Sequence, residues 1–342
     1  MPSLKSKLVQ LGMFKGLFHD ISDDDLYFRN LHDQMEFEFP LITSMLIPSD
    51  GVCLDIGANI GIKTFVMAKQ AKDGAVLAIE GSPRVYEALC LNIKNNELEN
   101  VCAENVAVTE VTSTVRFVEN SAWGYLVADD DKSTATEVPG ITLSDLINNH
   151  FQHRIGLREI SFVKIDTEGH EYKILKNAAP VLKKFNPWIY FEFNSYALIT
   201  FGDTNPKEFL KWVFSNFSYV FRVDRKALGT TSQALLHRFD SRDLKSLLHQ
   251  NIVSNGSVDD FLVTNRESAL NEVRHLLLPG DYSAQSMLLQ NQTPEVQAQD
   301  LKMYKEMLEA IKGSRSWRLT APFRFISGLR RRFFNKFSKV GR

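Results

Sequence analysis

The stretch that decides the fold is Val52-Cys-Leu-Asp-Ile-Gly-Ala-Asn-Ile-Gly61. It reads as a buried strand that ends in an acid, Asp55, and turns through Gly57 and Gly61 into a helix that begins near Ile60. Glycines let a backbone approach a ligand closely, and a strand-to-helix turn of this kind points N–H groups at it. We therefore expect a ligand at this turn, with the Asp55 carboxylate accepting hydrogen bonds from ammonium or hydroxyl groups.

Strands and helices alternate on both sides of this turn. Such alternation calls for a mostly parallel sheet with right-handed crossovers and helices on both faces, which is a Rossmann-like α/β fold. The expected sheet has about seven strands and closes near residue 265. The predicted strands span residues 52–54, 75–79, 101–108, 161–165, 188–193, 219–223 and 260–264, and the predicted helices span residues 35–46, 61–72, 83–95, 168–177 and 206–217.

The predicted sheet occupies only part of the chain, which divides into four segments. They are an N-terminal segment at 1–34, expected to be helical; the α/β domain at 35–265; a helical extension at 266–312; and a basic tail at 313–342.

An insert at residues 109–139 breaks the alternation within the domain. Two short strands are predicted there, at 115–118 and 125–127. The insert lies at the ligand edge of the sheet, where it either contacts an acceptor or forms a surface hairpin without a function.

Composition places the chain among globular proteins with an uneven charge distribution. The 342 residues are 44% hydrophobic, and three scattered cysteines without a C-x-x-C pair indicate a reducing cytoplasm. No signal peptide is recognisable, and no apolar run reaches the roughly 18 residues that span a bilayer. Formal net charge is −1, but residues 313–342 carry nine Lys or Arg and no acid, so the tail is at +9 and the rest of the chain at −10.

Glu80 ends the second predicted strand, 23 residues after Gly57. An acid about 20 residues after such a turn meets the ribose hydroxyls of a bound nucleoside. A dinucleotide turn needs the pattern G-x-G-x-x-G, but Asn59 and Ile62 occupy its second and third glycine positions. Both features fit S-adenosylmethionine, which has no pyrophosphate; a tight turn without a ligand is the alternative. The residues that we expect to bind this cofactor are Asp55, Gly57, Asn59, Gly61, Glu80, Ser82 and Asn105.

A second group of polar residues follows the predicted strand at 161–165, in Lys164-Ile-Asp-Thr-Glu-Gly-His-Glu171. Asp166 lies at the strand tip, and Gly169 removes a side chain from the first helical turn, which leaves room for a ligand. Helix capping would explain single residues of this run, but three acids and a histidine exceed what capping needs. Glu192 adds another acid at the end of the next predicted strand.

Five motifs follow one another along the chain. They are Leu54-Asp-Ile-Gly-Ala-Asn-Ile-Gly61, Ile79-Glu-Gly-Ser-Pro83, Asn105-Val-Ala-Val108, Val163-Lys-Ile-Asp-Thr-Glu-Gly-His-Glu171 and Phe191-Glu-Phe193. Together, over about residues 35–200, they resemble the FkbM family of S-adenosylmethionine-dependent methyltransferases. The resemblance implies a class I methyltransferase fold and methyl transfer to a hydroxyl oxygen of a sugar, polyketide or related metabolite. It also implies an acid upstream of the glycine turn, which would be Glu36 or Glu38.

Methyl transfer to a hydroxyl requires a base, because an alcohol holds its proton about as tightly as water, whose pKa is ~16. The catalytic candidates are Asp166, His170 and Glu192. Asp166 or His170 would take the proton, and Glu192 would orient the acceptor hydroxyl. Alternatively, Asp166, Glu168 and Glu192 ligate a divalent cation such as Mg²⁺ that lowers the pKa of the hydroxyl. A divalent metal is thus possible, but we assign no metal site.

The sequence of the tail predicts that it binds a membrane surface. Phe323, Ile326, Phe333, Phe334 and Phe337 fall within one helical sector of about 100°, with most of the nearby basic residues outside it. A basic amphipathic helix suits an anionic membrane surface, and we prefer this partner to nucleic acid, the competing polyanion. The string from Ser314 to Phe325 also resembles C-terminal segments of bacterial enzymes that build surface polysaccharides.

The sequence therefore predicts a cytoplasmic O-methyltransferase held peripherally on the inner face of the cytoplasmic membrane. Its expected acceptor is a sugar hydroxyl in a bacterial surface polysaccharide or its lipid-linked precursor. Two alternatives are an O-methyltransferase of a small secondary metabolite and a non-catalytic, membrane-associated scaffold that binds S-adenosylmethionine. The sequence makes no prediction of the oligomeric state.

Overall fold

The structure is a computed structural model. It describes residues 5–21, 26–33, 35–120, 124–127, 134–151, 159–229 and 233–279. The basic tail and most of the helical extension lie outside these ranges, so their predictions remain predictions. In the part of the chain that the structure describes, no helix is long and apolar enough to cross a membrane.

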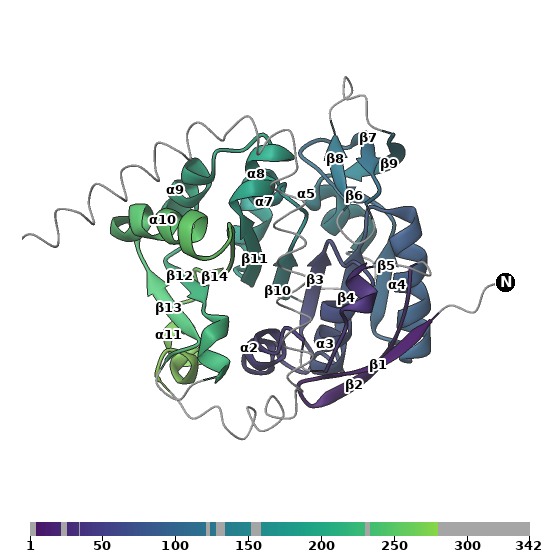
Figure 1. Cartoon of the computed structure of the whole chain (residues 1–342), viewed down its shortest axis with the longest axis horizontal. Coiled ribbons are helices and arrows are strands. Elements are labelled where there is room, and N and C mark those ends of the chain that lie inside the picture. The colour runs from purple at the N-terminus through teal and green to yellow at the C-terminus, as the bar shows by residue number, and fades with distance from the viewer. Residues whose placement is uncertain are drawn as a thin grey trace, which may run out of the picture. The chain divides into compact units, whose positions relative to one another are not determined.

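A central eight-stranded sheet has the order β13-β12-β14-β11-β10-β3-β4-β5 (Figure 1). Strands β5, β4, β3, β10 and β11 are parallel, whereas β14 is antiparallel to both of its neighbours and β13 is antiparallel to β12. The order reverses at β3, which places the switch point of the sheet, where α/β folds bind ligands, at the glycine turn. The strands are β3 (Val52–Ile56), β4 (Ala75–Ile79), β5 (Val101–Glu104), β10 (Ile160–Ile165), β11 (Trp188–Asn194), β12 (Tyr219–Val223), β13 (Leu236–Phe239) and β14 (Val258–Thr264).

The predicted Rossmann-like class is confirmed, but the predicted count of seven strands is wrong. The additional strand, β13, has the sequence Leu-His-Arg-Phe, which lacks a buried apolar run, and it forms by pairing with β12. The third predicted strand, at 101–108, is also two strands. β5 ends at Glu104, and β6 (Ala107–Val108) belongs to another sheet.

Successive strand residues face opposite sides of the sheet, so each strand contributes apolar side chains to both faces. Helices cover both of these faces. Cys53 and Phe162 belong to the apolar core under α2 (Glu38–Leu46), α3 (Ile62–Gln70) and α4 (Pro83–Asn95), and Leu54 and Val163 to the core under α7 (Glu171–Phe185), α9 (Pro206–Asn216) and α10 (Leu244–Ser254). The helix predicted at 168–177 thus begins later and runs further. The shorter helices are α1 (Leu26–Arg29), α5 (Leu143–Asp145), α8 (Ser195–Thr200), α11 (Ala269–Glu272), a π-helix η1 (Leu146–Phe151), and the 3-10 turns η2 (Arg225–Gly229), η3 (Ser241–Asp243) and η4 (Arg274–Leu276).

The helical prediction for residues 1–34 is wrong where it covers a hairpin of β1 (Ser6–Leu11) and β2 (Phe14–His19). The hairpin is held on α4, where the side chains of Asn92 and Asn96 each accept a hydrogen bond from a backbone N–H of β2 at 2.7 Å. These partners lie more than 70 residues away in sequence, so the strand conformation depends on a contact that the local pattern does not reveal.

The insert at 109–139 is part of a second, four-stranded sheet with the order β6-β9-β7-β8. Its two predicted strands are confirmed as β7 (Ser113–Val118) and β8 (Tyr125–Val127), and β9 (Thr136–Ile141) pairs with both β6 and β7. The Tyr125 ring stacks on Phe201, just after α8, with 4.0 Å between ring centroids. The second sheet therefore reaches across to the segment that follows β11.

Candidate active site

The backbone N–H groups of the glycine turn after β3 all form hydrogen bonds within the protein. The N–H groups of Gly57 and Ala58 both donate to the Ile79 carbonyl at 2.9 Å. The Asn59 N–H donates to the Glu80 carboxylate at 2.8 Å, and the next two N–H groups bond to the Asn59 side chain and the Ala58 carbonyl. The expectation that these N–H groups point at a ligand is therefore wrong, because they tie the turn to itself and to the end of β4.

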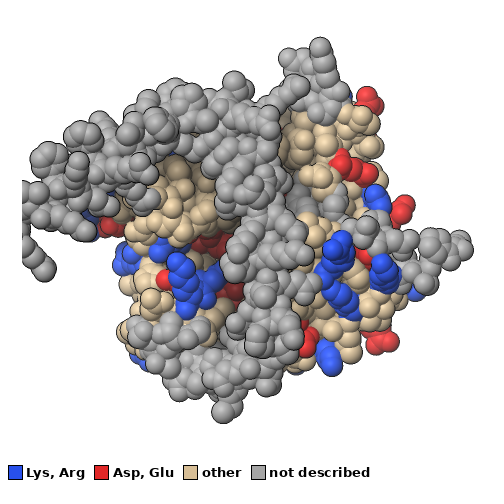
Figure 2. All heavy atoms as spheres, viewed as in Figure 1, with Lys and Arg blue, Asp and Glu red and all other residues tan. Residues whose placement is uncertain are grey.

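A cavity of about 1110 Å³, part of it open to solvent, lies at the carboxyl ends of β3, β4, β10 and β11. One part of its wall is charged and the other is apolar. The charged lining groups are Glu36, Lys63, Glu80, Lys164, Asp166, Glu168 and Glu192, and the apolar side chains include Val85, Val106, Phe117 and Leu126. Figure 2 shows basic and acidic side chains close together on the face seen in Figure 1, with acidic atoms visible in a hollow near the middle of the view.

Glu80 lines the cavity, and both of its carboxylate oxygens already accept a backbone N–H. The donors are Asn59 and Ser82, each at 2.8 Å. Because a carboxylate oxygen has two lone pairs, each can accept one further hydrogen bond from a ligand. Ser82 also lines the cavity, but its hydroxyl caps α4 by accepting the Val85 N–H at 3.2 Å and donates to Glu119 at 2.8 Å. This hydroxyl thus fastens the end of β7 to the loop after β4.

Three of the residues predicted to bind the cofactor lie behind the cavity wall. Asn105 donates to the carbonyls of Glu80 and Gly81, at 2.8 and 3.2 Å, and so supports their loop. Asp55 is fully buried, and Gly61 starts α3 with a φ of 94°. The predicted cofactor residues that do line the cavity are Gly57, Asn59, Glu80 and Ser82.

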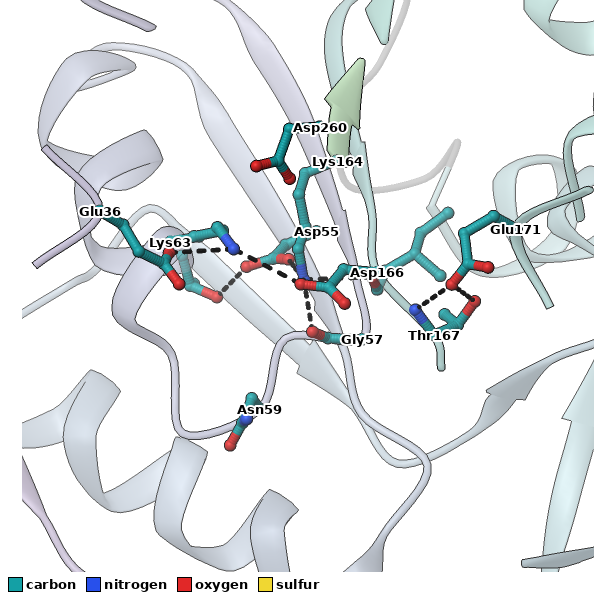
Figure 3. Close-up of polar contacts among 12 residues, drawn as sticks. Glu36, Asp55, Gly57, Asn59, Lys63, Lys164, Asp166, Thr167, Glu171 and Asp260 are labelled. Carbon is teal, nitrogen blue, oxygen red and sulfur yellow. Dashed lines mark hydrogen bonds and ion pairs between the residues drawn. The ribbon is translucent and has the colours of Figure 1, made fainter. Parts of the chain in front are cut away.

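An ion network of two lysines and three carboxylates lies beside the turn (Figure 3). The Lys164 ammonium is 3.1 Å from Asp55 and 3.8 Å from Asp166. The Lys63 ammonium is 3.0 Å from Glu36 and 3.4 Å from Asp166. Burial alone would raise the pKa of Asp166, but the two lysines hold that pKa below its usual value. Asp166 is therefore ionised and held between two cations.

Glu171 organises the turn between β10 and α7. Its carboxylate accepts the Thr167 N–H at 2.7 Å and the Gly169 N–H at 3.1 Å, and burial raises its pKa to about 7. Gly169 has a φ of 106°, and a Cβ there would lie 2.4 Å from the Ala197 carbonyl oxygen. The expected room beside Gly169 is therefore filled by the backbone of α8.

Glu168, His170 and Glu192 give the acceptor side of the cavity its chemistry. Within the described residues, Glu192 Oε2 and His170 Nε2 are buried without a hydrogen-bond partner. Burial and repulsion by Asp166 raise the pKa of Glu192 well above its usual value and that of Glu168 to about 8. Burial lowers the pKa of His170 to about 4, with a smaller contribution from Lys173. Near neutral pH, the cavity thus presents protonated carboxyls and a neutral imidazole beside the ionised Asp166.

Strained backbone also gathers at the cavity. Glu36, Asn59 and Glu168 have φ values of 51°, 53° and 53°, and all three line it. A side chain in this left-handed region costs about 1–2 kcal/mol. Such strain is found mostly where a fold holds a functional group in place.

The alternative of a metal bound by Asp166, Glu168 and Glu192 has no support from the geometry. Throughout the described ranges, no three His, Cys, Asp or Glu side chains are placed to hold one ion. The best-placed acid, Asp166, is paired with Lys63 and Lys164 instead.

All three predicted catalytic residues, Asp166, His170 and Glu192, line the cavity. Of the two acids that the family resemblance implied, Glu36 lines it, whereas Glu38 pairs with Arg225 at 2.7 Å. Sequence reasoning missed Lys63 and Lys164. For Lys164 a signal was present, because it is the one charged residue of β10, a strand of mostly apolar side chains.

The two parts of the cavity wall fit the two parts of S-adenosylmethionine. Val85, Val106, Phe117 and Leu126 can pack against a purine, and Glu80 beside them has lone pairs for ribose hydroxyls. The carboxylates at the other end complement a cationic sulfonium and ammonium group.

Comparison with known proteins gives the same assignment. Residues 55–223 match the methyltransferase FkbM domain. The chain is 26% identical to the methyltransferase sdnD of Sordaria araneosa over 38% of this chain and 61% of that protein. It is 48% identical to a tRNA(Phe) (4-demethylwyosine(37)-C(7)) aminocarboxypropyltransferase of Methanocaldococcus jannaschii over 15% of this chain and 20% of that one.

A solved structure of the methyltransferase FkbM from Methylobacillus flagellatus KT is similar with a TM-score of 0.38 and 15% identity. The match covers 64% of this chain and 44% of that one, so the chain spans less than two thirds of the length of each of these three proteins. Residues 55–223 form a methyltransferase domain of the FkbM family, whose cofactor is S-adenosylmethionine.

Proposed function

We propose that the protein is an S-adenosylmethionine-dependent O-methyltransferase that methylates a hydroxyl of a sugar in a surface polysaccharide or its lipid-linked precursor. One observation carries the proposal: a single cavity joins the glycine turn to the carboxyls of Asp166, Glu168 and Glu192. One oxygen of Glu192 is buried without a partner among the described residues. Carboxyl groups accept and donate hydrogen bonds to hydroxyls, and a sugar offers several hydroxyls at once.

The bound cofactor supplies an electrophilic methyl group, and the chain must supply position and a proton acceptor. Asp166 is a weak base, because two lysines stabilise its charge. Burial and the acids around Glu192 raise its pKa, so in the free site it holds its own proton more tightly than an exposed carboxyl does. Glu192 loses this proton to solvent when a cation binds beside it, and once ionised it is a stronger base than Asp166. We therefore assign proton removal from the acceptor hydroxyl to Glu192, and orientation of that hydroxyl to Asp166.

His170 has a supporting role in this scheme. Its imidazole is neutral near pH 7, because burial lowers its pKa to about 4. A neutral imidazole can donate a hydrogen bond to a sugar oxygen without adding a charge to the acceptor site. It is too weakly basic to compete with Glu192 for the proton.

The activity test uses S-adenosylmethionine with a ¹³C-labelled methyl group and a glycan or lipid-linked glycan fraction from cells that lack the gene. We expect a ¹³C methyl ether in the glycan that survives mild alkali, whereas a methyl ester would release methanol. The variant Glu192→Gln should lose transfer. Its matched control, Glu208→Gln on the exposed surface of α9, should keep it. Transfer to a small metabolite with none to any glycan would overturn the acceptor, and cofactor binding without any transfer would favour the scaffold.

The sequence of the tail supports the lipid-linked acceptor. Residues 313–342 carry nine basic residues and no acid, which suits an anionic membrane where such precursors are made. Deletion of residues 313–342 should move the protein from the membrane fraction to the supernatant. Unchanged fractionation would contradict membrane binding through the tail and leave the assignment of the reaction intact.

A further inference from the structure

Lys164 is a charged side chain that is almost completely buried. It is the fifth of the six residues of the buried strand β10 and is 2% exposed. Burying an ammonium group costs free energy unless each of its three donors finds a partner. The Lys164 ammonium donates to the Gly57 carbonyl at 2.5 Å and to the Ile56 carbonyl at 3.4 Å, and it forms ion pairs with Asp55 at 3.1 Å and Asp166 at 3.8 Å.

We propose that Lys164 is a positioning residue of the active site, whose ammonium group fixes the glycine turn after β3 against Asp166 after β10. It thereby sets the distance between the part of the cavity that holds the cofactor and the carboxylates that meet the acceptor. The first half of this inference concerns the turn alone, and the second half rests on the proposed function.

The contacts distinguish this role from that of a simple counter-ion for Asp55. Asp55 already accepts a hydrogen bond from the Thr64 hydroxyl at 2.6 Å. The shortest contact of Lys164 is to the carbonyl of Gly57, which carries no net charge. A counter-ion would need only Asp55, whereas Lys164 joins the strand, the turn and the neighbouring loop.

The turn and the Asp166 loop also touch directly. A Cβ at Gly57 would lie 1.8 Å from the carbonyl oxygen of Asp166, so the two backbones are in contact at this point. A shift of the turn therefore shifts Asp166 as well. Lys63 holds the same Asp166 carboxylate from the side of α3, at 3.4 Å (Figure 3). Asp166 is thus fixed from two directions, and Lys164 links it to the turn through its side chain.

The test separates position from charge with two variants. Lys164→Met leaves Asp55 buried without its cation and is expected to be unstable. The double variant Lys164→Met/Asp55→Asn removes both charges of the pair and should fold, while the Gly57 carbonyl and Asp166 still lose their partner. Lys211→Met, which removes an exposed lysine from α9, is the matched control.

The first readout is calorimetric binding of S-adenosylhomocysteine, which contains the adenosyl and amino acid parts without a methyl to transfer. The second is hydrogen exchange of peptides covering residues 57–61 and 166–169, compared with peptides of β14. We expect the double variant to bind roughly tenfold to hundredfold more weakly, the range for losing a partner that orients a binding group. We also expect faster exchange in those two segments and unchanged exchange in β14.

Binding and exchange equal to those of the wild type would overturn the proposal and leave Lys164 as a counter-ion of Asp55. A double variant that does not fold would also overturn it, because Lys164 would then serve general stability. If the wild type itself fails to bind S-adenosylhomocysteine, the proposed function fails, and the exchange comparison still decides whether Lys164 fixes the turn.

Discussion

Glu168 should make the protein less stable as the pH rises, and Glu168→Gln should remove that dependence. The Glu168 carboxyl lines the cavity, where burial and repulsion by Asp166 and Glu171 raise its pKa from 4.5 to about 8. Glutamine has nearly the same size and keeps the backbone as it is, so the substitution removes the titration and little else. The assay therefore reports the electrostatic cost of one active-site acid.

The sign follows from proton linkage. Because the folded-state pKa is raised, the folded state binds the Glu168 proton more tightly than the unfolded state does between about pH 4.5 and 8. The free energy of unfolding of the wild type thus falls as pH rises through this window. At about 1.4 kcal/mol per pKa unit, a group titrating alone would lose about 5 kcal/mol. Protonation of Glu192 relieves part of the same repulsion, so we expect Glu168→Gln to gain about 2 kcal/mol relative to wild type at about pH 8.5.

The measurement is urea unfolding followed by circular dichroism at about pH 5, 7 and 8.5, with a common slope m for both proteins. We expect the two midpoints to agree near pH 5 and to separate as pH rises, with the variant more stable. Glu208→Gln, at an exposed acid of α9, should follow the wild type at every pH. A difference between Glu168→Gln and wild type that is constant from pH 5 to 8.5 would refute the reasoning.

Three further substitutions test the site. Gly57→Ala should lower the free energy of unfolding by about 2–4 kcal/mol, because a Cβ would meet the Asp166 carbonyl at 1.8 Å. Gly256→Ala, which has a similar φ of 65° but nothing within 4 Å, should cost only about 1–2 kcal/mol, and equal losses in urea unfolding would contradict the clash. Glu192→Gln should lower the transfer rate by about 10²–10⁴ while S-adenosylhomocysteine binds as in the wild type, so normal turnover would remove Glu192 as the base. Phe117→Leu should weaken that binding by about two- to tenfold through loss of ring contacts with the purine, and unchanged affinity in calorimetry would place the purine elsewhere.

Local chemistry made part of the fold and site predictable. Ser82-Pro83 predicts a helix start, and the structure begins α4 at Pro83 with the Ser82 hydroxyl accepting the Val85 N–H. The glycine turn and the acids at the ends of β3, β4, β10 and β11 were predictable for the same reason, since the residues next to a strand mark its end. Because parallel strands bring their carboxyl ends to one edge, Asp166 and Glu192 were expected to meet, and both line the cavity.

Features that depend on distant partners were not predictable. The contact of Lys164 with Gly57 spans 107 residues and exists only because β10 lies beside β3 in the sheet. The first hairpin is fixed by asparagines of α4, and Gly169 is confined by the backbone of α8. In each case a long-range neighbour decides what a residue does. A single sequence shows which residue is present, but it does not show which distant residue that residue contacts.

The charges that line the cavity lead to a last prediction, which distinguishes the cofactor from its product. Five carboxyls face two lysines there, and the raised pKa values of Glu168 and Glu192 show that the site holds protons that it would lose to a nearby cation. S-Adenosylmethionine carries a sulfonium charge, and S-adenosylhomocysteine does not. Binding of the cofactor should therefore release a fraction of a proton near pH 7, and binding of the product should release little.

The affinity of S-adenosylmethionine relative to S-adenosylhomocysteine should thus rise by about two- to threefold per pH unit between about pH 6 and 8, where one full proton would give tenfold. Calorimetry in buffers of different ionisation enthalpy measures the released proton directly for both ligands. In Glu168→Gln the difference should shrink, since one of the titrating carboxyls is gone. Equal proton release by the two ligands would mean that the acids do not respond to the sulfonium. The same acids, by favouring a cation over a neutral thioether, would also speed product release, which gives the destabilising Glu168 a function.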